Sequence, residues 1–464
     1  MSTAHSKAAE KFLKNSQQAE WHNETLWMVR AKRDKLSKQV PEWEELRNNA
    51  EALKLYSSSH WVELLTEFEK NAIANGAVVH WAKDAQEYRE IVYQLLSERN
   101  VKNFVKSKSM LSEECELDDY LIERGIDTVE TDLGECILQL MKLPPSHIVL
   151  PAIHIKREQV GELFEEKLNT EKGNFDPTYL THQARKYLRQ IFLNADASMT
   201  GGNFAVASTG EVVVCTNEGN ADMGTAATDF HIAAFGLDKI VPDRESLGVF
   251  TRLLARSATG QPITSYTAHY SKPKKNGEFH IIIVDNGRSE ILGNEEHRKV
   301  LNCIRCGACM NTCPVYRRSG GYSYSYFIPG PIGINLGMAH APNKHAGNLS
   351  ACSLCLSCSM VCPAKVDLGE QIYKWRQKLD ELGESNTTKK ILSKGMKLVM
   401  DNPALFNAAL WAAPMVNKMP RFMVYNKLNA WGEGRDLPQF ASESFNSMWK
   451  RNKVQLNDNK KDNE

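Results

Sequence analysis

Eight of the eleven cysteines in this chain fall in two copies of one pattern. Each copy reads C-x2-C-x2-C-x3-C-P, over residues 303–314 and 352–363. Bacterial ferredoxins hold [4Fe–4S] clusters with this spacing, and the fourth cysteine of each run completes the other cluster. The sequence therefore predicts two [4Fe–4S] clusters, the first on Cys303, Cys306, Cys309 and Cys362 and the second on Cys352, Cys355, Cys358 and Cys313.

Zinc is the main alternative, because paired C-x2-C steps also build four-thiolate zinc sites. A zinc site uses two separated pairs, whereas each run here adds a third cysteine in step and then Cys-Pro. Disulfides are disfavoured because the remaining cysteines, Cys115, Cys136 and Cys215, are scattered and cytosolic thiols stay reduced. The pattern favours electron transfer.

The bulk composition excludes some classes of partner. With 24% charged residues and a net charge of +1, nothing indicates nucleic acid as a polyanionic partner. The N-terminus lacks the apolar segment of a secretory signal. The longest apolar run, residues 404–416, is shorter than the about 20 residues that a membrane helix needs. We therefore expect a cytoplasmic protein with at most peripheral membrane association.

Changes in composition and hydrophobic pattern along the 464 residues divide the chain into four predicted segments. Residues 1–75 read as helices that pack by one face, or as an arm that embraces a partner. Residues 76–293 alternate strands and helices, 294–384 hold the cysteine motifs, and 385–464 form a helical extension with a disordered tail from 457. A linker is expected at 384–388 and an irregular packed loop at 322–333, between the motifs.

The second segment is predicted to hold a parallel α/β sheet. Strands are expected at 77–81, 102–106 and 126–130, with helices at 84–99 and 117–124 between them. Two hairpins are expected later, one joining 204–208 to 212–215 and one joining Tyr270 to 279–284. In the last segment, apolar residues from Leu405 to Met419 predict a buried helix or a docking surface.

Three polar stretches follow or precede predicted strands and could bind a small anion. Glycines allow close approach of the backbone, and lysines neutralise a carboxylate or phosphate. Turn-forming residues of this kind are also common without any function. The candidates for anion or substrate binding are Lys106, Lys108, Ser109, Gly201, Asn203, Thr209, Gly210, Asn217, Glu218 and Asn220.

Catalytic residues cannot be read from the sequence, because no nucleophile and base stand in a recognisable pair. His147 and His154, which flank an apolar run, are candidates for acid–base work, since histidine titrates near neutral pH. Satisfied structural histidines are the alternative. No glycine-rich nucleotide-binding motif of the Rossmann or P-loop type is present.

The whole chain resembles the lactate utilization protein B family, the iron–sulfur subunits of a three-protein bacterial system that oxidises L-lactate. The stretches that carry the resemblance are Ser109-Met110, 130–135, 145–148, 203–210, 216–220, the twin cysteine motifs and 431–438. Where the family pattern usually has a glutamate before Thr209-Gly210, this chain has Ser208, which puts any carboxylate role there in doubt.

The resemblance implies an α/β domain similar to sugar-phosphate isomerases and CoA transferases, followed by an α-helical ferredoxin-type module with two [4Fe–4S] clusters. It implies two partner subunits, one rich in cysteine and one with a second lactate-utilization domain. The implied function is an electron-transfer subunit of an oxidoreductase that turns lactate into pyruvate and is not complete alone.

Three readings of the function stay open. In the first, the chain only transfers electrons between other proteins. In the second, its α/β crevice itself binds and oxidises lactate or another hydroxy acid of the glycolate type. In the third, the chain is a redox sensor or an assembly scaffold. The electron acceptor and any flavin cannot be read from the sequence. Arg305 lies inside the first motif and the second motif has no charged residue, so the first cluster is expected to be easier to reduce.

Overall fold

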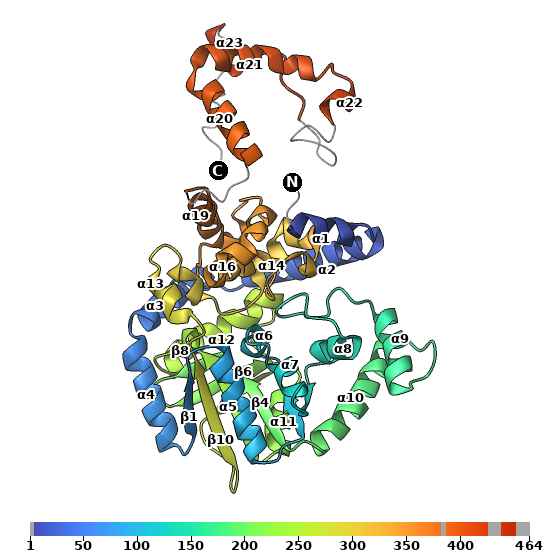
Figure 1. Ribbon diagram of the computed structural model, residues 1–464, viewed down its shortest axis with the longest axis vertical. Coiled ribbons are helices and arrows are strands. Elements are labelled where there is room, and N and C mark those ends of the chain that lie inside the picture. Colours follow the sequence, from blue (N-terminus) through green and yellow to red (C-terminus); the bar gives the residue numbers. More distant parts are fainter. Residues whose placement is uncertain (1–3, 382–386, 426–437, 452–464) are drawn as a thin grey trace. The chain divides into compact units, whose positions relative to one another are not determined.

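The computed structural model describes residues 4–381, 387–425 and 438–451. The chain divides into two compact units, residues 1–378 and 379–464, and each is described by itself. The larger unit contains the α/β domain and both cysteine motifs (Figure 1). Three stretches discussed above lie outside the described residues: the start of the predicted linker, residues 431–437 and the predicted disordered tail.

A six-stranded parallel sheet forms the centre of the larger unit. Its strands are β1 (Val78–Ala82), β2 (Asn103–Lys106), β3 (Asp127–Glu130), β4 (Ala197–Gly201), β7 (Phe230–Gly236) and β10 (Glu278–Val284), in the spatial order β1-β10-β7-β4-β2-β3. Every neighbouring pair is parallel; Ile282 of β10, for example, lies opposite Ala234 of β7. The predicted parallel α/β sheet is confirmed.

Helices connect these strands and cover the sheet. They are α5 (Ala85–Glu98), α6 (Met110–Glu114), α7 (Leu117–Ile122), α8 (Leu133–Met141), α9 (Arg157–Leu168), α10 (Pro177–Leu193), α11 (Asn220–Ala227) and α12 (Arg244–Thr259). The Asp84 carboxylate accepts the N–H of Glu87 and begins α5 at its predicted place. Tyr88, Val92 and Leu95 lie on one face of α5 and are buried in the core.

A second, four-stranded sheet lies beside the first, in the order β8 (Ile240–Val241), β5 (Phe204–Val206), β6 (Glu211–Thr216) and β9 (Tyr266–Tyr270). The predicted hairpin of β5 and β6 is confirmed. The predicted second hairpin is wrong: β9 pairs with β6, and β10 lies between β1 and β7 in the parallel sheet. Residues 279–284 are all buried, which is typical of a central parallel strand rather than a hairpin arm.

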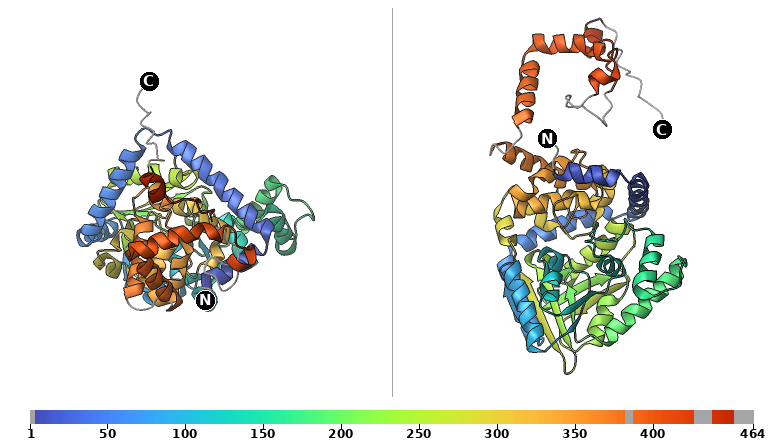
Figure 2. Two further views of the ribbon diagram at one scale, coloured as in Figure 1. Left: turned by 90° about the horizontal axis from the view of Figure 1, so that it is seen from above. Right: turned by 45° about the vertical axis from the view of Figure 1, so that its right-hand side comes forward.

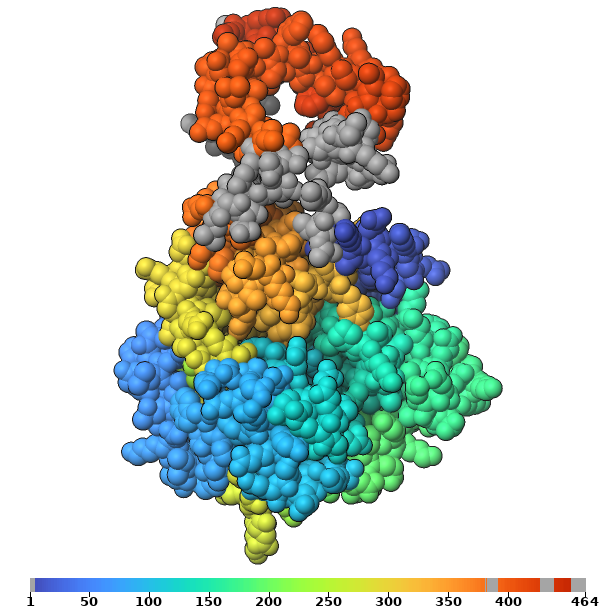
Figure 3. Space-filling model, viewed as in Figure 1, coloured from blue at the N-terminus to red at the C-terminus, as the bar shows by residue number. Residues whose placement is uncertain are grey.

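The cysteine segment, residues 294–378, is built of short helices. They are η2 (Arg298–Asn302), α14 (Ala308–Thr312), α15 (Pro314–Ser319), η3 (Gly321–Ser323), α16 (Gly330–His340), α17 (Pro342–His345), η4 (Ala346–Ala351), α18 (Ser357–Val361) and α19 (Leu368–Glu381), with α13 (Arg288–Gly293) before them. The predicted irregular loop is shorter than expected, since α16 begins at Gly330. In Figure 3 this yellow-to-orange segment lies directly on the α/β domain.

The N-terminal helices are α1 (Ala4–Leu13), α2 (Ser16–Ser37), α3 (Trp43–Ser59) and α4 (Trp61–Ala74). Helix α2 packs against α12, α14 and α15, and α4 packs beside β1 (Figure 2). These helices therefore join the α/β domain to the cysteine segment of their own chain.

The smaller unit contains α20 (Thr387–Asp401), α21 (Pro403–Val416), α22 (Arg421–Val424) and α23 (Phe445–Lys450). The predicted buried helix is wrong for the described residues: α21 has no buried residue, and Trp411 is 74% exposed. Leu405, Trp411 and Met415 are exposed, which leaves the alternative of a docking surface. Within the described ranges, no helix is both long and apolar enough to cross a membrane.

Candidate functional site

The two cysteine motifs fold into the same local structure. In each, the residue two places after the first cysteine has a positive φ, +60° at Arg305 and +55° at Leu354. The residue after the second cysteine does so too, +75° at Gly307 and +61° at Leu356, and a short helix follows it. Successive N–H groups thus turn toward the cysteine sulfurs: those of Arg305 and Leu354 donate to Cys303 Sγ and Cys352 Sγ at 3.4 and 3.3 Å.

Four thiols, which we call the first thiol set, line one small apolar cavity. They are Cys303, Cys306, Cys309 and Cys362, and the cavity wall includes Ile332 and Val366. Burial first, and then the neighbouring thiols of this set and Cys358, hold the pKa of Cys309 well above its usual range. The fourth member comes from the second motif, and the N–H of Val366 donates to its sulfur at 3.4 Å.

The other four thiols, Cys313, Cys352, Cys355 and Cys358, form the second thiol set. Burial, followed by the charges of the other three, raises the pKa of Cys358 to about 12. Cys313 belongs to the first motif, and the N–H of Tyr316 donates to its sulfur at 3.5 Å. Unlike any thiol of the first set, Cys355 is exposed.

An iron–sulfur cluster fits these thiols better than zinc does. A tetrahedral zinc site with Zn–S bonds of about 2.3 Å brings its sulfurs to about 3.8 Å from one another. Among the described residues, no three cysteine sulfurs lie within 4.8 Å of one another. The raised pKa values mean that these buried groups cannot become thiolates together unless a cation compensates them. The iron of a cluster would supply that charge, and the N–H donors suit sulfur ligands.

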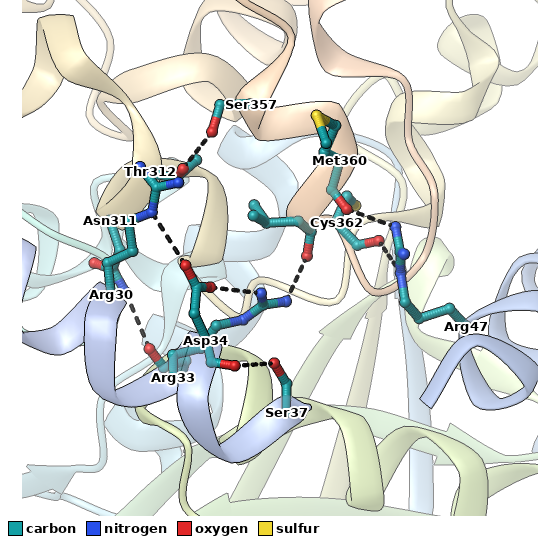
Figure 4. Close-up of polar contacts among 12 residues, drawn as sticks. Arg30, Arg33, Asp34, Ser37, Arg47, Asn311, Thr312, Ser357, Met360 and Cys362 are labelled. Carbon is teal, nitrogen blue, oxygen red and sulfur yellow. Dashed lines mark hydrogen bonds and ion pairs between the residues drawn. The ribbon is translucent and has the colours of Figure 1, made fainter. Parts of the chain in front are cut away.

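Arginines of the N-terminal helices hold the end of the second motif (Figure 4). Arg33 Nη2 donates to the carbonyl oxygen of Val361 at 2.9 Å. Arg47 donates through Nη2 to the carbonyl of Met360 at 2.8 Å and through Nε to that of Cys362 at 3.1 Å. Near the second thiol set, Arg376 donates to the carbonyl of Cys352 at 2.7 Å. Positive charge therefore lies beside both sets.

A larger cavity of about 350 Å³ lies where the α/β domain meets the first motif. Its wall includes residues that follow or end β2, β4, β6 and β7, the edge where an open α/β sheet usually binds ligands. Ile304, Arg305 and Cys306 close the other side, so Cys306 borders both cavities. Seven of the ten predicted anion-binding residues line this cavity: Lys108, Ser109, Gly201, Asn203, Asn217, Glu218 and Asn220.

The other three predicted anion-binding residues lie elsewhere. Lys106 is fully buried and forms ion pairs with Glu130 and, at 3.3 Å, with Asp118. The turn at Thr209 and Gly210 packs against α4, where a side chain at Gly210 would come within 2.2 Å of the Ala72 nitrogen. Neither the lysine nor this turn lines the cavity.

The two candidate acid–base histidines hold the loop of residues 144–155 in place. His147 Nδ1 accepts the N–H groups of Val149 and Leu150, so Nε2 carries the proton and donates to Asn311 Oδ1 at 2.9 Å. Burial lowers the pKa of His147 to about 3 and that of His154 to about 4. Both rings are neutral near pH 7, and neither lines the large cavity, although the neighbouring Ile148 does.

Several residues of the site were not predicted as its members. Ser107, Thr216, Lys239 and Arg288 line the large cavity, and Arg33 and Arg47 contact the second motif. Ser107 could have been predicted from the sequence, because it lies between two predicted residues, Lys106 and Lys108. The arginines lie about 300 residues from their partners, since Arg47 and Cys362 are separated by 315 positions, and no local pattern marks them.

Comparison with known families assigns each part of the chain. The LUD domain model matches residues 65–291, the 4Fe-4S dicluster domain model matches 299–366, and the model of the C-terminal domain of lactate utilisation protein B matches 377–454. A solved DUF162 family protein from Deinococcus radiodurans covers 48% of this chain at 15% identity with a TM-score of 0.27, too distant a likeness to bear on the fold.

Relatives match along almost the whole chain. Lactate utilization protein B 1 of Bacillus mycoides is 38% identical and the match covers 93% of this chain and 92% of that protein. Lactate utilization protein B of Bacillus pumilus is 40% identical over 89% and 90%. The electron transport protein YkgF of Escherichia coli, described as uncharacterized, is 38% identical over 92% of both chains. With the motifs, fold and thiol geometry above, these matches place the chain in the lactate utilization protein B family.

Proposed function

We propose that this chain is the iron–sulfur electron-transfer subunit of a system that oxidises L-lactate to pyruvate. Two [4Fe–4S] clusters are held, one by the first thiol set and one by the second. The observation that carries this proposal is the division of the eight thiols into two sets, each completed by a cysteine of the other motif. A [4Fe–4S] cluster takes up and releases one electron at a time, so two of them suit a two-electron oxidation.

The surroundings of the two thiol sets indicate the direction in which electrons pass through the protein, from the first set to the second. The first set has three buried thiols and borders the large cavity through Cys306. The second set reaches the surface at Cys355, beside Leu356 and Met360, which are 47% and 74% exposed. The first set therefore faces the interior of the protein, and the second faces an electron-transfer partner.

The partners we propose are two further subunits of the same system, a cysteine-rich redox subunit and a second subunit with a lactate-utilization domain, acting in the cytoplasm. The names of the relatives support membership in a lactate-utilization system. The exposed rim of the second thiol set supports a redox partner that docks there, because electron transfer requires close approach.

Replacing the crossed cysteines one at a time tests the assignment of the ligands. Cys362→Ser is expected to remove the first cluster although Cys362 lies in the second motif, and Cys313→Ser is expected to remove the second. Iron and sulfide analysis with EPR of the reduced protein measures this, and Cys215→Ser, a thiol outside both sets, is the matched control. Loss of the second cluster's signal in Cys362→Ser would show that each motif binds its own cluster instead.

The large cavity beside Cys306 favours a second hypothesis, in which this chain itself oxidises the hydroxy acid. Lactate titration of the anaerobic, oxidised protein separates the two. The relay hypothesis expects no change in the cluster spectrum until partner subunits are added, whereas self-sufficient oxidation expects bleaching by lactate alone.

A further inference from the structure

The wall of the 350 Å³ cavity contains buried hydrogen-bond donors without partners. Ser107 Oγ, Thr216 Oγ1, Lys108 Nζ and Arg305 Nη1 are all buried, and none has a hydrogen-bond partner among the described residues. Lys108 Nζ lies 2.9 Å from Glu135 Oε1, but the two groups are not aligned for a hydrogen bond. Leaving a buried donor unpaired is unfavourable, so donors of this kind around one cavity call for an acceptor inside it.

Several carboxylate oxygens of the cavity wall already accept hydrogen bonds from the protein. Asp132 accepts the N–H groups of Gly134 and Glu135 at the start of α8, and Glu218 accepts the N–H of Leu133 at 3.0 Å. Glu114 binds Arg288 through both of its oxygens at 2.9 Å. These contacts occupy Asp132 Oδ2, Glu218 Oε2 and both oxygens of Glu114. None of them reaches Ser107 Oγ, Thr216 Oγ1 or Arg305 Nη1, so a ligand in the cavity can supply the acceptor for these donors.

Arg305 brings to the cavity a positive charge that no salt bridge of the described residues neutralises. The other cations of the wall form ion pairs, Lys108 with Glu135, Lys239 with Asp238 and Arg288 with Glu114. Within the described part of the chain, the guanidinium of Arg305 has no ion pair and no side-chain hydrogen bond, and its Nη1 is buried. A planar guanidinium is suited to a carboxylate.

The rest of the wall is apolar and fits a short hydrocarbon part. Ile148, Val214, Leu254 and Ala258 lie around the cavity together with its polar groups. Burial, and then the neighbouring Asp132 carboxylate, raise the pKa of Glu218 to about 7, although much of this side chain is exposed. Glu218 is partly protonated near neutral pH, so it repels an anion less than an ordinary glutamate would.

We propose that this cavity binds a small organic monocarboxylate with an oxygen on the adjacent carbon, a 2-hydroxy or 2-oxo acid. Arg305 and Lys108 bind the carboxylate, and the hydroxyls of Ser107 and Thr216 bind the adjacent oxygen. This inference rests on the proposed function for the choice of a lactate-like acid, while the requirement for an anion rests on the cavity itself.

The backbone of Arg305 connects this ligand to the first thiol set. Its N–H donates to Cys303 Sγ while its side chain lines the cavity, so a bound anion changes the field at that sulfur. Occupation of the cavity is therefore expected to shift the EPR signal of the first cluster and to leave that of the second unchanged, because no thiol of the second set lines the cavity.

Isothermal titration calorimetry with pyruvate and with L-lactate tests the proposal on the full chain. Ser107→Ala and Thr216→Val remove hydroxyls that have no partner in the protein, so the fold loses no hydrogen bond, yet each is expected to weaken binding about tenfold. Arg305→Gln is expected to weaken it by more than tenfold.

The matched controls are Ser257→Ala and Thr209→Val, which remove equally unpartnered hydroxyls that do not line the cavity. These controls are expected to bind with unchanged affinity. Absence of binding to the wild type, equal effects of the controls, or tighter binding of inorganic phosphate than of pyruvate would overturn the proposal.

Iron content and EPR spectra are measured on the same samples. Two intact clusters without ligand binding would refute the cavity proposal and leave the electron-transfer proposal standing. Binding of pyruvate to protein whose thiols hold no cluster would do the reverse.

Discussion

The guanidinium of Arg47 donates to the carbonyl oxygen of Cys362 at 3.1 Å. A helix from the beginning of the chain therefore contacts a thiol ligand that lies 315 residues later and belongs to the first thiol set. The N-terminal helices thus contribute to the cysteine site as well as to packing, because they bring fixed positive charge close to one of the two sets.

Replacing Arg47 by glutamine is expected to lower the midpoint potential of the first cluster. Loss of a positive charge disfavours the added electron, and a shift of about 50 mV corresponds to about 1 kcal/mol of interaction with a unit charge. Potentiometric EPR measures the shift, with Arg157→Gln, an exposed arginine paired with Glu158, as the control. A shift of the second cluster larger than that of the first would contradict this assignment of the charge.

Arg305→Ala is expected to act in the same direction on the first cluster. Its charge lies inside the first motif, while the second motif has Leu354 in the equivalent position. The difference between the two midpoint potentials should therefore shrink in this variant. An unchanged potential of the first cluster would show that the guanidinium does not act on it.

Gly307→Ala is expected to destabilise the first motif. A Cβ there would lie 3.0 Å from His147 Cε1 and 3.1 Å from Val149 Cγ2, and φ is +75°. We expect a loss of about 1–2 kcal/mol and lower iron occupancy, read from melting temperature and iron analysis. Gly248→Ala within α12, where a Cβ meets nothing within 4 Å, is the control and should be neutral or stabilising. Equal effects of both changes would exclude a local steric cause.

Lys106→Met is expected to be strongly destabilising, by about 3–5 kcal/mol. It leaves the carboxylates of Glu113, Asp118 and Glu130, which lie within 4.8 Å of one another, without their buried cation. Mn²⁺ should restore part of the melting temperature, because carboxylate oxygens bind it well. Lys102→Met, at an exposed position, is the control.

The stability of that variant should depend on pH with a defined sign. Burial already raises the pKa of Glu113 to about 7 in the wild type, and Lys106 opposes this shift. A carboxyl whose folded pKa is raised loses stability as pH rises from its unfolded pKa of about 4.5 toward its folded pKa. The variant should therefore melt closer to the wild type at pH 5.5 than at pH 8, and the reverse order would contradict the carboxylate explanation.

The sequence predicted the elements of the sheet well and their pairing less well. The strand at 77–81 and the helix at 84–99 were recognisable from local patterns, and each lies within one residue of its place. The strand that pairs with residues 279–284 was not recognisable from local patterns, because an apolar run and a glycine turn are compatible with both a hairpin and a central strand. Pairing over 200 positions, as between β1 and β10, leaves no local signal.

In the candidate site, too, single residues could be predicted from local patterns but their neighbours in space could not. Lys108, Asn203 and Glu218 were predicted separately and meet because parallel strands end at one edge. Arg305 was predicted for its charge but not for its place in the cavity wall. Leu356, which adopts a positive φ where the first motif has Gly307, could not be predicted, since only the surrounding fold imposes a conformation that a leucine disfavours.

The exposure of Cys355 also has a consequence for the durability of the protein. Dissolved oxygen and chelators reach the second thiol set from the surface at Cys355, whereas three thiols of the first set are buried and Cys303 is half-buried. In air, iron should be lost from the second set first. A partly degraded sample should therefore keep the first cluster, beside the large cavity. That cluster could still be reduced, but it could no longer pass its electron on through the second cluster.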